Sequence, residues 1–223
     1  MTRLHVVRRG QGPPLVLLHG MGSTSATWDA CAALLEDRYT VVTFDLLGHG
    51  RSPVPDDPAE YTRDGALEDV DEILATLPEP AVLVGHSLGG YLALAHAATR
   101  PGVARGVVVL NTGPGFRDEA KREDWNARSR RNAHRFGVAP QAAELNLQHD
   151  GVVMERLAEI TVPTLVLAGE ADRPEYAGAG RYLARKMPNC RFVALPGGGH
   201  DMHEGTHAAE VARLVDEHVR GLG

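Results

Sequence analysis

The 223-residue sequence has little cysteine, few aromatic residues and no long hydrophobic run. Two cysteines, Cys31 and Cys190, are too few for a disulfide framework, which favours a reducing compartment. No apolar stretch approaches the ~18 residues that a membrane-spanning helix needs. The first twelve residues also lack the apolar segment of a secretory signal. We therefore expect a cytoplasmic protein that does not enter a membrane.

An excess of positive charge is also missing. The chain has 23 Lys and Arg against 29 Asp and Glu, a formal net charge of −6. A net-acidic chain is poorly suited to binding nucleic acid non-specifically or lying on anionic lipid. The partner that we expect is instead a small-molecule substrate, with no nucleic acid and no membrane involved.

Short Val- and Leu-rich runs alternate with segments of helical periodicity. Most of these runs lack a two-residue alternation, which is typical of strands buried on both faces. The predicted strands are 15–18, 41–44, 81–84, 107–110, 165–168 and 192–195, and the predicted helices are 25–35, 66–77, 88–99, 182–187 and 208–218. This order predicts an α/β fold with a mainly parallel sheet and helices on both of its faces.

One segment interrupts the alternation. Residues 114–150 contain no strand-like run, few large apolar side chains, and basic and acidic residues in nearly equal number. We predict an inserted helical lid there, on a core formed by residues 1–113 and 151–223. Insertions at strand ends are where such folds place substrate specificity.

The strongest motif is GHSLG at 85–89, which matches G-x-S-x-G between a predicted strand and a predicted helix. A tight turn in that setting lifts the Ser87 hydroxyl out of the sheet. It also directs the N-terminus of the following helix at the position where an oxyanion would form. Ser87 is therefore the candidate nucleophile.

A serine nucleophile needs a base, and the base needs an acid to orient it. Asp172 and His200 each follow a predicted parallel strand, so we expect both to meet Ser87 at one edge of the sheet. Taken alone, Asp172 could be a helix cap and His200 a surface histidine. The order Ser, Asp, His along the chain favours a catalytic triad.

A candidate oxyanion hole comes from HGMG at 19–22, directly after the first predicted parallel strand. Glycines there let the backbone approach the site, so that the N–H groups of Met21 and Leu88 can both point at a substrate carbonyl oxygen. The alternative is an ordinary glycine turn.

These motifs together resemble those of the α/β-hydrolase superfamily along nearly the whole chain. The resemblance rests on the segments 19–22, 44–52, 85–90, 169–172 and 198–200. It implies that Ser87 is the nucleophile, with His200 as the base and Asp172 as its orienting acid. Met21 and Leu88 would be the oxyanion donors, with no metal or organic cofactor. A serine at this position argues against the epoxide hydrolases and haloalkane dehalogenases of the same fold, which use aspartate.

Within the family pattern, Asp45 belongs to the turn FDLLGHGRS at 44–52. The resemblance implies a structural role for it, fixing the loop, and not a catalytic one.

The string HEGTH at 203–207 matches the H-E-x-x-H pattern of zinc metalloproteases. Gly205 weakens the helix which that site requires, and the string starts three residues after His200. We favour solvated residues at the start of the last helix, and no metal site.

Four arginines, at 128, 130, 131 and 135, crowd one part of the predicted lid, and Trp125 lies one turn before Arg128. A solvated helix surface is one explanation. The other is that Trp125 and Arg128 bind a substrate carboxylate or phosphate. Such groups occur on acyl-CoA, on carrier-protein thioesters and on the acidic substrates of carbon–carbon hydrolases.

The function that we predict is hydrolysis of a carboxylic ester or thioester through an acyl-enzyme on Ser87. One alternative is a cofactor-free lyase or carbon–carbon hydrolase that uses the same triad on an acidic small molecule. Menaquinone-pathway synthases and meta-cleavage hydrolases resemble the chain at 85–90. Another alternative is a receptor-like member that binds a ligand and turns it over slowly.

Overall fold

A seven-stranded sheet forms the centre of the protein in the computed structural model, which describes residues 3–223. The strand order is β1-β3-β2-β4-β5-β6-β7, with β1 antiparallel and the other six parallel. The strands are β1 Val6–Arg9, β2 Pro14–Leu18, β3 Thr40–Phe44, β4 Val82–His86, β5 Gly106–Leu110, β6 Thr164–Gly169 and β7 Cys190–Leu195. The predicted α/β fold with a mainly parallel sheet is confirmed.

Strand β1 was not predicted from the sequence. It is only four residues long, VVRR, and it lies at the edge of the sheet with none of its side chains fully buried. Short edge strands carry charge and need no continuous apolar run, so the Val- and Leu-rich pattern that identified the six parallel strands is absent here.

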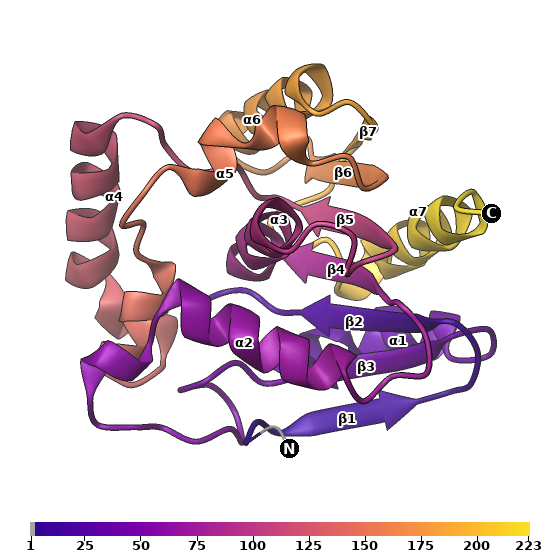
Figure 1. Ribbon diagram of the computed structural model, residues 1–223, viewed down its shortest axis with the longest axis horizontal. Coiled ribbons are helices and arrows are strands. Elements are labelled where there is room, and N and C mark those ends of the chain that lie inside the picture. The colour runs from indigo at the N-terminus through magenta and orange to yellow at the C-terminus, as the bar shows by residue number, and fades with distance from the viewer. Residues whose placement is uncertain (1–2) are drawn as a thin grey trace.

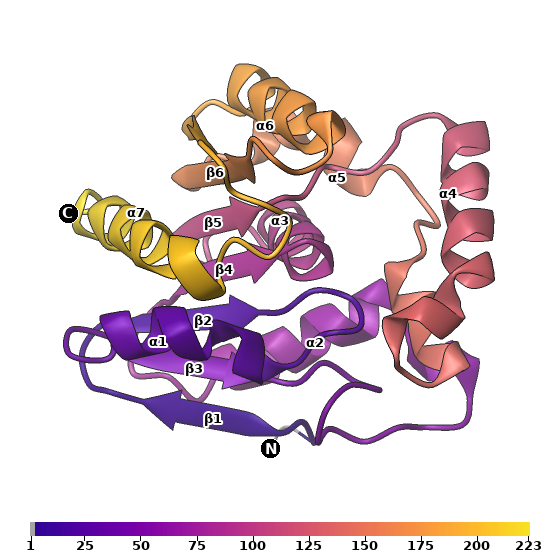
Figure 2. The same cartoon turned by 180° about the vertical axis from the view of Figure 1, so that it is seen from behind.

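Helices cover both faces of the sheet (Figures 1 and 2). They are α1 Asp29–Leu35, α2 Arg63–Leu74, α3 Leu88–Thr99, α4 Glu119–Arg131, α5 Val152–Glu155, α6 Pro174–Lys186 and α7 Ala208–Arg220. Buried side chains of α1 and α7 belong to one apolar cluster, and those of α2, α3 and α6 to the other. Strands β2, β4, β5 and β6 are thus buried on both faces, as their continuous apolar runs indicate.

Helix α6 is longer than the sequence pattern indicated, because it begins at Pro174 and not at Tyr182. Proline suits the first turn of a helix, where its missing N–H would have no intrahelical partner. This longer helix starts two residues after Asp172, and so it brings additional residues to the candidate site.

The segment 114–150 is helical and contains no strand, and α4 stands beyond the carboxyl ends of the parallel strands (Figures 1 and 2). Side-chain hydrogen bonds hold the segment to itself. The Trp125 indole N–H donates to the carbonyl of Asn146 at 2.8 Å, and the Asn126 side chain bonds both backbone groups of Gln148. Helical structure continues after residue 150 in α5, which packs against α3. The division into a core and a lid at residue 150 stays a prediction.

Within residues 3–223, no helix combines the length and the apolar character that crossing a membrane requires.

Candidate active site

Ser87 lies in the turn between β4 and α3, in a backbone conformation that few L-residues adopt. Its φ is 51° and its ψ is −113°. Three hydrogen bonds hold the residue there: its N–H donates to Leu110 O at 2.9 Å, and its carbonyl accepts from Tyr91 N at 3.0 Å and from Thr112 Oγ1 at 2.7 Å. Such strain persists only where the surroundings enforce it, and it is typical of functional sites.

The glycines of the motif are required by close backbone approach. A Cβ on Gly85 would lie 2.3 Å from the carbonyl oxygen of Gly89, and a Cβ on Gly89 would lie 2.3 Å from that of Leu18. Both distances are far inside van der Waals contact. The G-x-S-x-G spacing therefore follows from how tightly β4, α3 and β2 pack around Ser87.

The structure brings Asp172 and His200 together at the carboxyl ends of β6 and β7. The Nδ1–H of His200 donates to Asp172 Oδ2 at 2.7 Å, and the Asp172 side chain is 7% exposed against 35% for that of His200. A carboxylate at Nδ1 fixes the imidazole tautomer and leaves Nε2 as the basic nitrogen. This is the geometry that a general base requires.

Asn111, which the sequence motifs did not single out, ties this edge of the sheet together. Its Nδ2 donates to Gly199 O at 2.9 Å and to His200 O at 2.7 Å, while its Oδ1 accepts from Gly169 N at 2.9 Å. It is fully buried, with a φ of 45°. The available signal was its place directly after a predicted strand, where asparagine tolerates this conformation better than most residues do.

Tyr176, on the first turn of α6, lies against both reactive side chains. Its ring centroid is 5.1 Å from that of His200, and its hydroxyl is hydrogen-bonded to Ser87. Burial raises the pKa of Tyr176, so that the hydroxyl stays protonated at neutral pH. Tyr176 thus joins Ser87 and His200 into one cluster with Asp172. No sequence motif marks Tyr176 beyond its position four residues after Asp172.

The glycine loop at 19–22 reaches the same cluster. A Cβ on Gly20 would lie 3.3 Å from Ser87 Cβ and 3.0 Å from His86 Nδ1, so a side chain there would crowd both residues. Met21 follows at once, and Leu88 begins α3, where the first N–H groups have no partner within the helix. The loop and the helix start therefore lie on either side of Ser87.

Asp45 has the structural role that the family resemblance implied. Its buried carboxylate accepts from Ser25 N at 2.7 Å and from Arg51 N at 2.8 Å. A Cβ on Gly50 would lie 2.3 Å from Asp45 Oδ2. These contacts fix the loop after β3.

Two buried histidines, His86 and His203, lie side by side next to His200. His86 Nε2 donates to the carbonyl of His200 at 2.9 Å, and the His86 ring is 4.3 Å from that of His203 between centroids. Burial is the main cause that lowers the pKa of His203 to about 3 and that of His86 well below its ordinary value. Both rings are therefore neutral near pH 7.

The expectation of solvated residues at 203–207 is wrong for His203. Its side chain is fully buried and packs on Trp28, with ring centroids 4.3 Å apart. His207 is half-buried and lies in a 3-10 turn, Gly205–His207, so the two histidines do not share the helix face that zinc binding requires.

In the described part of the chain, one group of metal-ligand side chains converges: His86, His200 and Asp201, whose ligand atoms lie within 4.8 Å of one another. Nδ1 of His200 is already bonded to Asp172, and Nε2 of His86 to a carbonyl. One nitrogen of each ring is thus held in a hydrogen bond that orients the ring.

Trp125 and Arg128 interact with other residues of the segment 114–150. The guanidinium of Arg128 lies 6.0 Å from the centroid of the Trp125 ring and 3.3 Å from the Asp124 carboxylate, and the Arg128 side chain is about half exposed. Nearby Arg130 pairs with Glu144 at 2.9 Å. Within the described residues 3–223, no hydrogen bond, ion pair or ring contact joins Trp125 or Arg128 to the Ser87 cluster, and their role in substrate binding stays a prediction.

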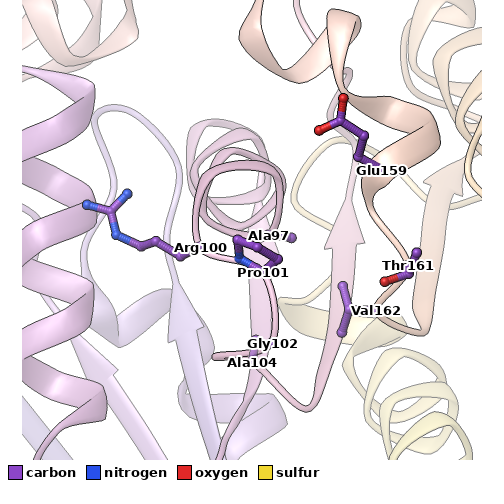
Figure 3. Close-up of a pocket in the computed structure, with 8 residues that line it drawn as sticks. All are labelled: Ala97, Arg100, Pro101, Gly102, Ala104, Glu159, Thr161 and Val162. Atoms are coloured by element: carbon purple, nitrogen blue, oxygen red, sulfur yellow. The ribbon is translucent and has the colours of Figure 1, made fainter.

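A small pocket of about 20 Å³ lies at the far end of α3 (Figure 3). Its lining residues are Ala97, Arg100, Pro101, Gly102, Ala104, Glu159, Thr161 and Val162. Because a helix rises about 1.5 Å per residue, this pocket lies roughly 15 Å from the start of α3. It is separate from the site around Ser87.

Comparison with known proteins places this chain in a family. The α/beta hydrolase fold model matches residues 13–147, and a second alpha/beta hydrolase family model matches 116–214. The pimeloyl-[acyl-carrier protein] methyl ester esterase of Nitrosospira multiformis is 37% identical over 88% of this chain and 91% of its own. The 2-(acetamidomethylene)succinate hydrolase of Mesorhizobium japonicum is 28% identical over 90% of this chain and 86% of its own.

Among solved structures, that of MenH from S. aureus superposes with a TM-score of 0.85 over 98% of both chains, at 23% sequence identity. Such a likeness at low identity supports the fold alone. The family models and the esterase relative go further, since they cover most of the chain and place its relatives among hydrolytic enzymes. The chain belongs to the α/β-hydrolase family, and it is a hydrolase.

Proposed function

We propose that this hydrolase cleaves a carboxylic ester or thioester with Ser87 as nucleophile, His200 as general base and Asp172 as the acid that orients it. The observation that carries the proposal is the 2.7 Å hydrogen bond between His200 Nδ1 and Asp172 Oδ2, in a cluster that Tyr176 joins to Ser87. With Nδ1 bonded to Asp172, Nε2 of His200 would be the nitrogen that takes the Ser87 proton.

In the proposed reaction, Ser87 Oγ attacks the substrate carbonyl carbon while its proton passes to His200 Nε2. The tetrahedral intermediate collapses as His200 gives that proton to the departing alcohol or thiol, which leaves an acyl group on Ser87. A water molecule then attacks the acyl carbon, with its proton passing to His200. The second collapse returns the proton to Ser87 and releases the acid.

The negative oxygen of each intermediate would rest between the N–H groups of Met21 and Leu88. The loop at 19–22 and the start of α3 approach Ser87 from two sides, and the N-terminal end of a helix favours negative charge. Removing one oxyanion donor typically costs ~10²–10³ in kcat, so the placement of this loop is central to the rate.

The relatives support the choice of substrate class. The Nitrosospira multiformis protein is named for the cleavage of a methyl ester, which favours an ester substrate here. The second candidate is hydrolysis of an acidic small molecule other than a simple ester. The 28% identical 2-(acetamidomethylene)succinate hydrolase favours it, since its substrate is a succinate derivative.

The state of the two cysteines bears on the location of the enzyme. Both cysteines are free, and burial raises the pKa of Cys31 to about 12, so its thiol stays protonated. We place the enzyme in the cytoplasm, acting on a small molecule without nucleic acid or membrane. Cell fractionation with an antibody tests this assignment, and recovery in the membrane pellet would contradict it.

Trapping the acyl-enzyme tests the proposed chemistry directly. Mixing the protein with p-nitrophenyl butyrate and quenching it within milliseconds should give a mass increase of one butyryl group, located on the peptide that contains Ser87. The Ser87→Ala variant is the control and should gain no mass. Acylation at another residue, or an unmodified protein that still releases nitrophenol, would contradict the assignment.

A further inference from the structure

The peptide bond between Gly20 and Met21 carries the candidate oxyanion donor on one side and a hydrogen-bonded carbonyl on the other. His19 Nδ1 lies 2.7 Å from Gly20 O. In a trans peptide the C=O and the N–H point in opposite directions, so a partner that holds the carbonyl also fixes the direction of the N–H. The orientation of the Met21 N–H is thus set by the ring of His19.

The other ring nitrogen identifies the tautomer. Leu46 N–H donates to His19 Nε2 at 3.0 Å, so Nε2 bears the lone pair and Nδ1 bears the hydrogen. Nδ1–H then donates to Gly20 O. Only the neutral Nδ1–H form makes both bonds, because a protonated ring has no acceptor for Leu46.

A second histidine, His49, bonds the glycine loop at Gly22 and also has both ring nitrogens in hydrogen bonds to the backbone. Gly22 N–H donates to His49 Nε2 at 3.2 Å, and His49 Nδ1 bonds the carbonyl of Leu47 at 2.9 Å. The centroids of the His19 and His49 rings are 5.2 Å apart. Together the two rings attach the loop at 19–22 to the loop after β3.

The surroundings keep both rings neutral. His19 and His49 are fully buried, and burial lowers the pKa of His19 to about 4 and that of His49 below its ordinary value. The charged group that faces them is Asp45, which raises both pKa values less than burial lowers them and is itself bonded to backbone N–H groups. His86 and His203, which also lie in the field of His19, are neutral near pH 7.

We infer that His19 and His49 are positioning residues for the oxyanion hole: His19 orients the Gly20–Met21 peptide, and His49 anchors the loop at Gly22. This inference rests on the proposed function, because it assigns the Met21 N–H to the oxyanion. The segment 114–150 also packs closely against this loop, since a Cβ on Gly22 would lie 2.5 Å from the carbonyl oxygen of Phe136.

Asparagine and glutamine separate the two bonds that each histidine makes. An asparagine amide can replace Nδ1 but does not reach as far as Nε2, whereas a glutamine amide can replace Nε2. His19→Asn therefore keeps the bond to Gly20, and His19→Gln keeps the one to Leu46. His49→Gln keeps the bond to Gly22, and His49→Asn keeps the one to Leu47.

The inference predicts that the order of the two substitutions reverses between the two positions. With p-nitrophenyl butyrate, His19→Gln and His49→Asn should lower kcat by ~10- to 100-fold with little change in KM, while their counterparts stay within a few-fold of the wild type. Inhibition by a trifluoromethyl ketone, whose adduct carries an oxyanion, should weaken by the same factor as kcat/KM.

His96→Asn is the matched control. His96 is another fully buried histidine with a side-chain partner, Asp71, but it lies near the far end of α3. This variant should lose stability and keep kcat. If instead kcat in all five variants follows their stability alone, or if the order of Asn and Gln is the same at both positions, the inference is overturned.

Nitrogen-15 NMR of the histidine rings gives a reading that does not depend on turnover. The wild-type protein at pH 7 should show the Nδ1–H tautomer for His19 and His49, and an Nε2–H tautomer at either one overturns the inference. Failure of the proposed function looks different: Ser87→Ala would then be as active as the wild type, whatever the tautomers are.

Discussion

The side chain of Asn111, at the end of β5, donates to the backbone carbonyl of His200 at 2.7 Å and so holds the loop that carries the candidate base. The same amide bonds the neighbouring carbonyl of Gly199 and the N–H of Gly169. One buried residue therefore sets the spacing between the ends of β5, β6 and β7. His200 is thus held through its backbone carbonyl by Asn111 and through its ring by Asp172.

Replacing Asn111 should harm catalysis more than substrate binding. In Asn111→Asp, a carboxylate would face two carbonyl oxygens that it cannot bond, and the His200 loop would shift. We expect kcat to fall by ~10- to 100-fold, since a small misplacement of a catalytic group has effects of that size. Steady-state kinetics with a short-chain ester measures this effect. An Asn111→Asp variant with wild-type kcat would show that the His200 loop holds its position unaided.

The buried histidines make the fold sensitive to mild acid. The pKa of His19 is lowered to about 4 and that of His203 to about 3, against an ordinary value of 6.5 in the unfolded chain. Between these values the unfolded state binds more protons than the folded state. The stabilisation is therefore complete above pH 6.5 and is lost as the pH falls toward 4.

Urea unfolding between pH 7.5 and 4.5 tests this sign. The free energy of unfolding should decrease as the pH falls below 6.5, and the decrease should be smaller in the His19→Asn variant, which lacks one of the titrating rings. A stability that is constant or rises over this range would contradict the assignment of neutral buried rings.

Tyr176 offers a test of the cluster that surrounds Ser87. Tyr176→Phe keeps the ring against His200 and removes only the hydroxyl that bonds Ser87. Since a neutral hydrogen bond contributes about 0.5–1.5 kcal/mol, we expect kcat/KM to fall by ~2- to 10-fold. Tyr182→Phe, further along α6, is the control and should behave as the wild type. Equal values for the two variants would remove Tyr176 from the site.

Arg128 tests the proposed role of the lid in binding an acidic group. Arg128→Ala should raise KM for substrates with a free carboxylate or phosphate far more than for neutral esters, because it removes a charge that only the acidic substrates would use. Arg130→Ala is the comparison, as Arg130 is already paired with Glu144. If Arg128→Ala changes KM equally for acidic and neutral substrates, Arg128 belongs to the solvated surface.

Motif and periodicity were enough to predict the parallel sheet. The strands before Ser87 and Asp172 are buried along their whole length, and such strands are recognisable because both of their faces are covered. The edge strand β1 could not be found this way, since its VVRR sequence has no buried side chains.

The residues that support the site were less visible in the sequence. Tyr176, Asn111 and His203 act through contacts between segments that lie far apart along the chain, such as the packing of His203 on Trp28. A sequence pattern reports which neighbours are local, and it contains no signal for a ring that becomes buried only when the loop before α7 packs on Trp28. The prediction that His203 is solvated was wrong for this reason.

The most direct measurement is the turnover of p-nitrophenyl acetate, butyrate and octanoate, with one acyl-CoA, by the wild type and by Ser87→Ala. The account predicts a saturable rate that falls by ~10⁴ or more in the variant, as expected when a triad nucleophile is removed. The ranking of the four substrates then identifies the acyl length and leaving group. Equal rates in the two proteins would contradict the account, because hydrolysis would then proceed without Ser87.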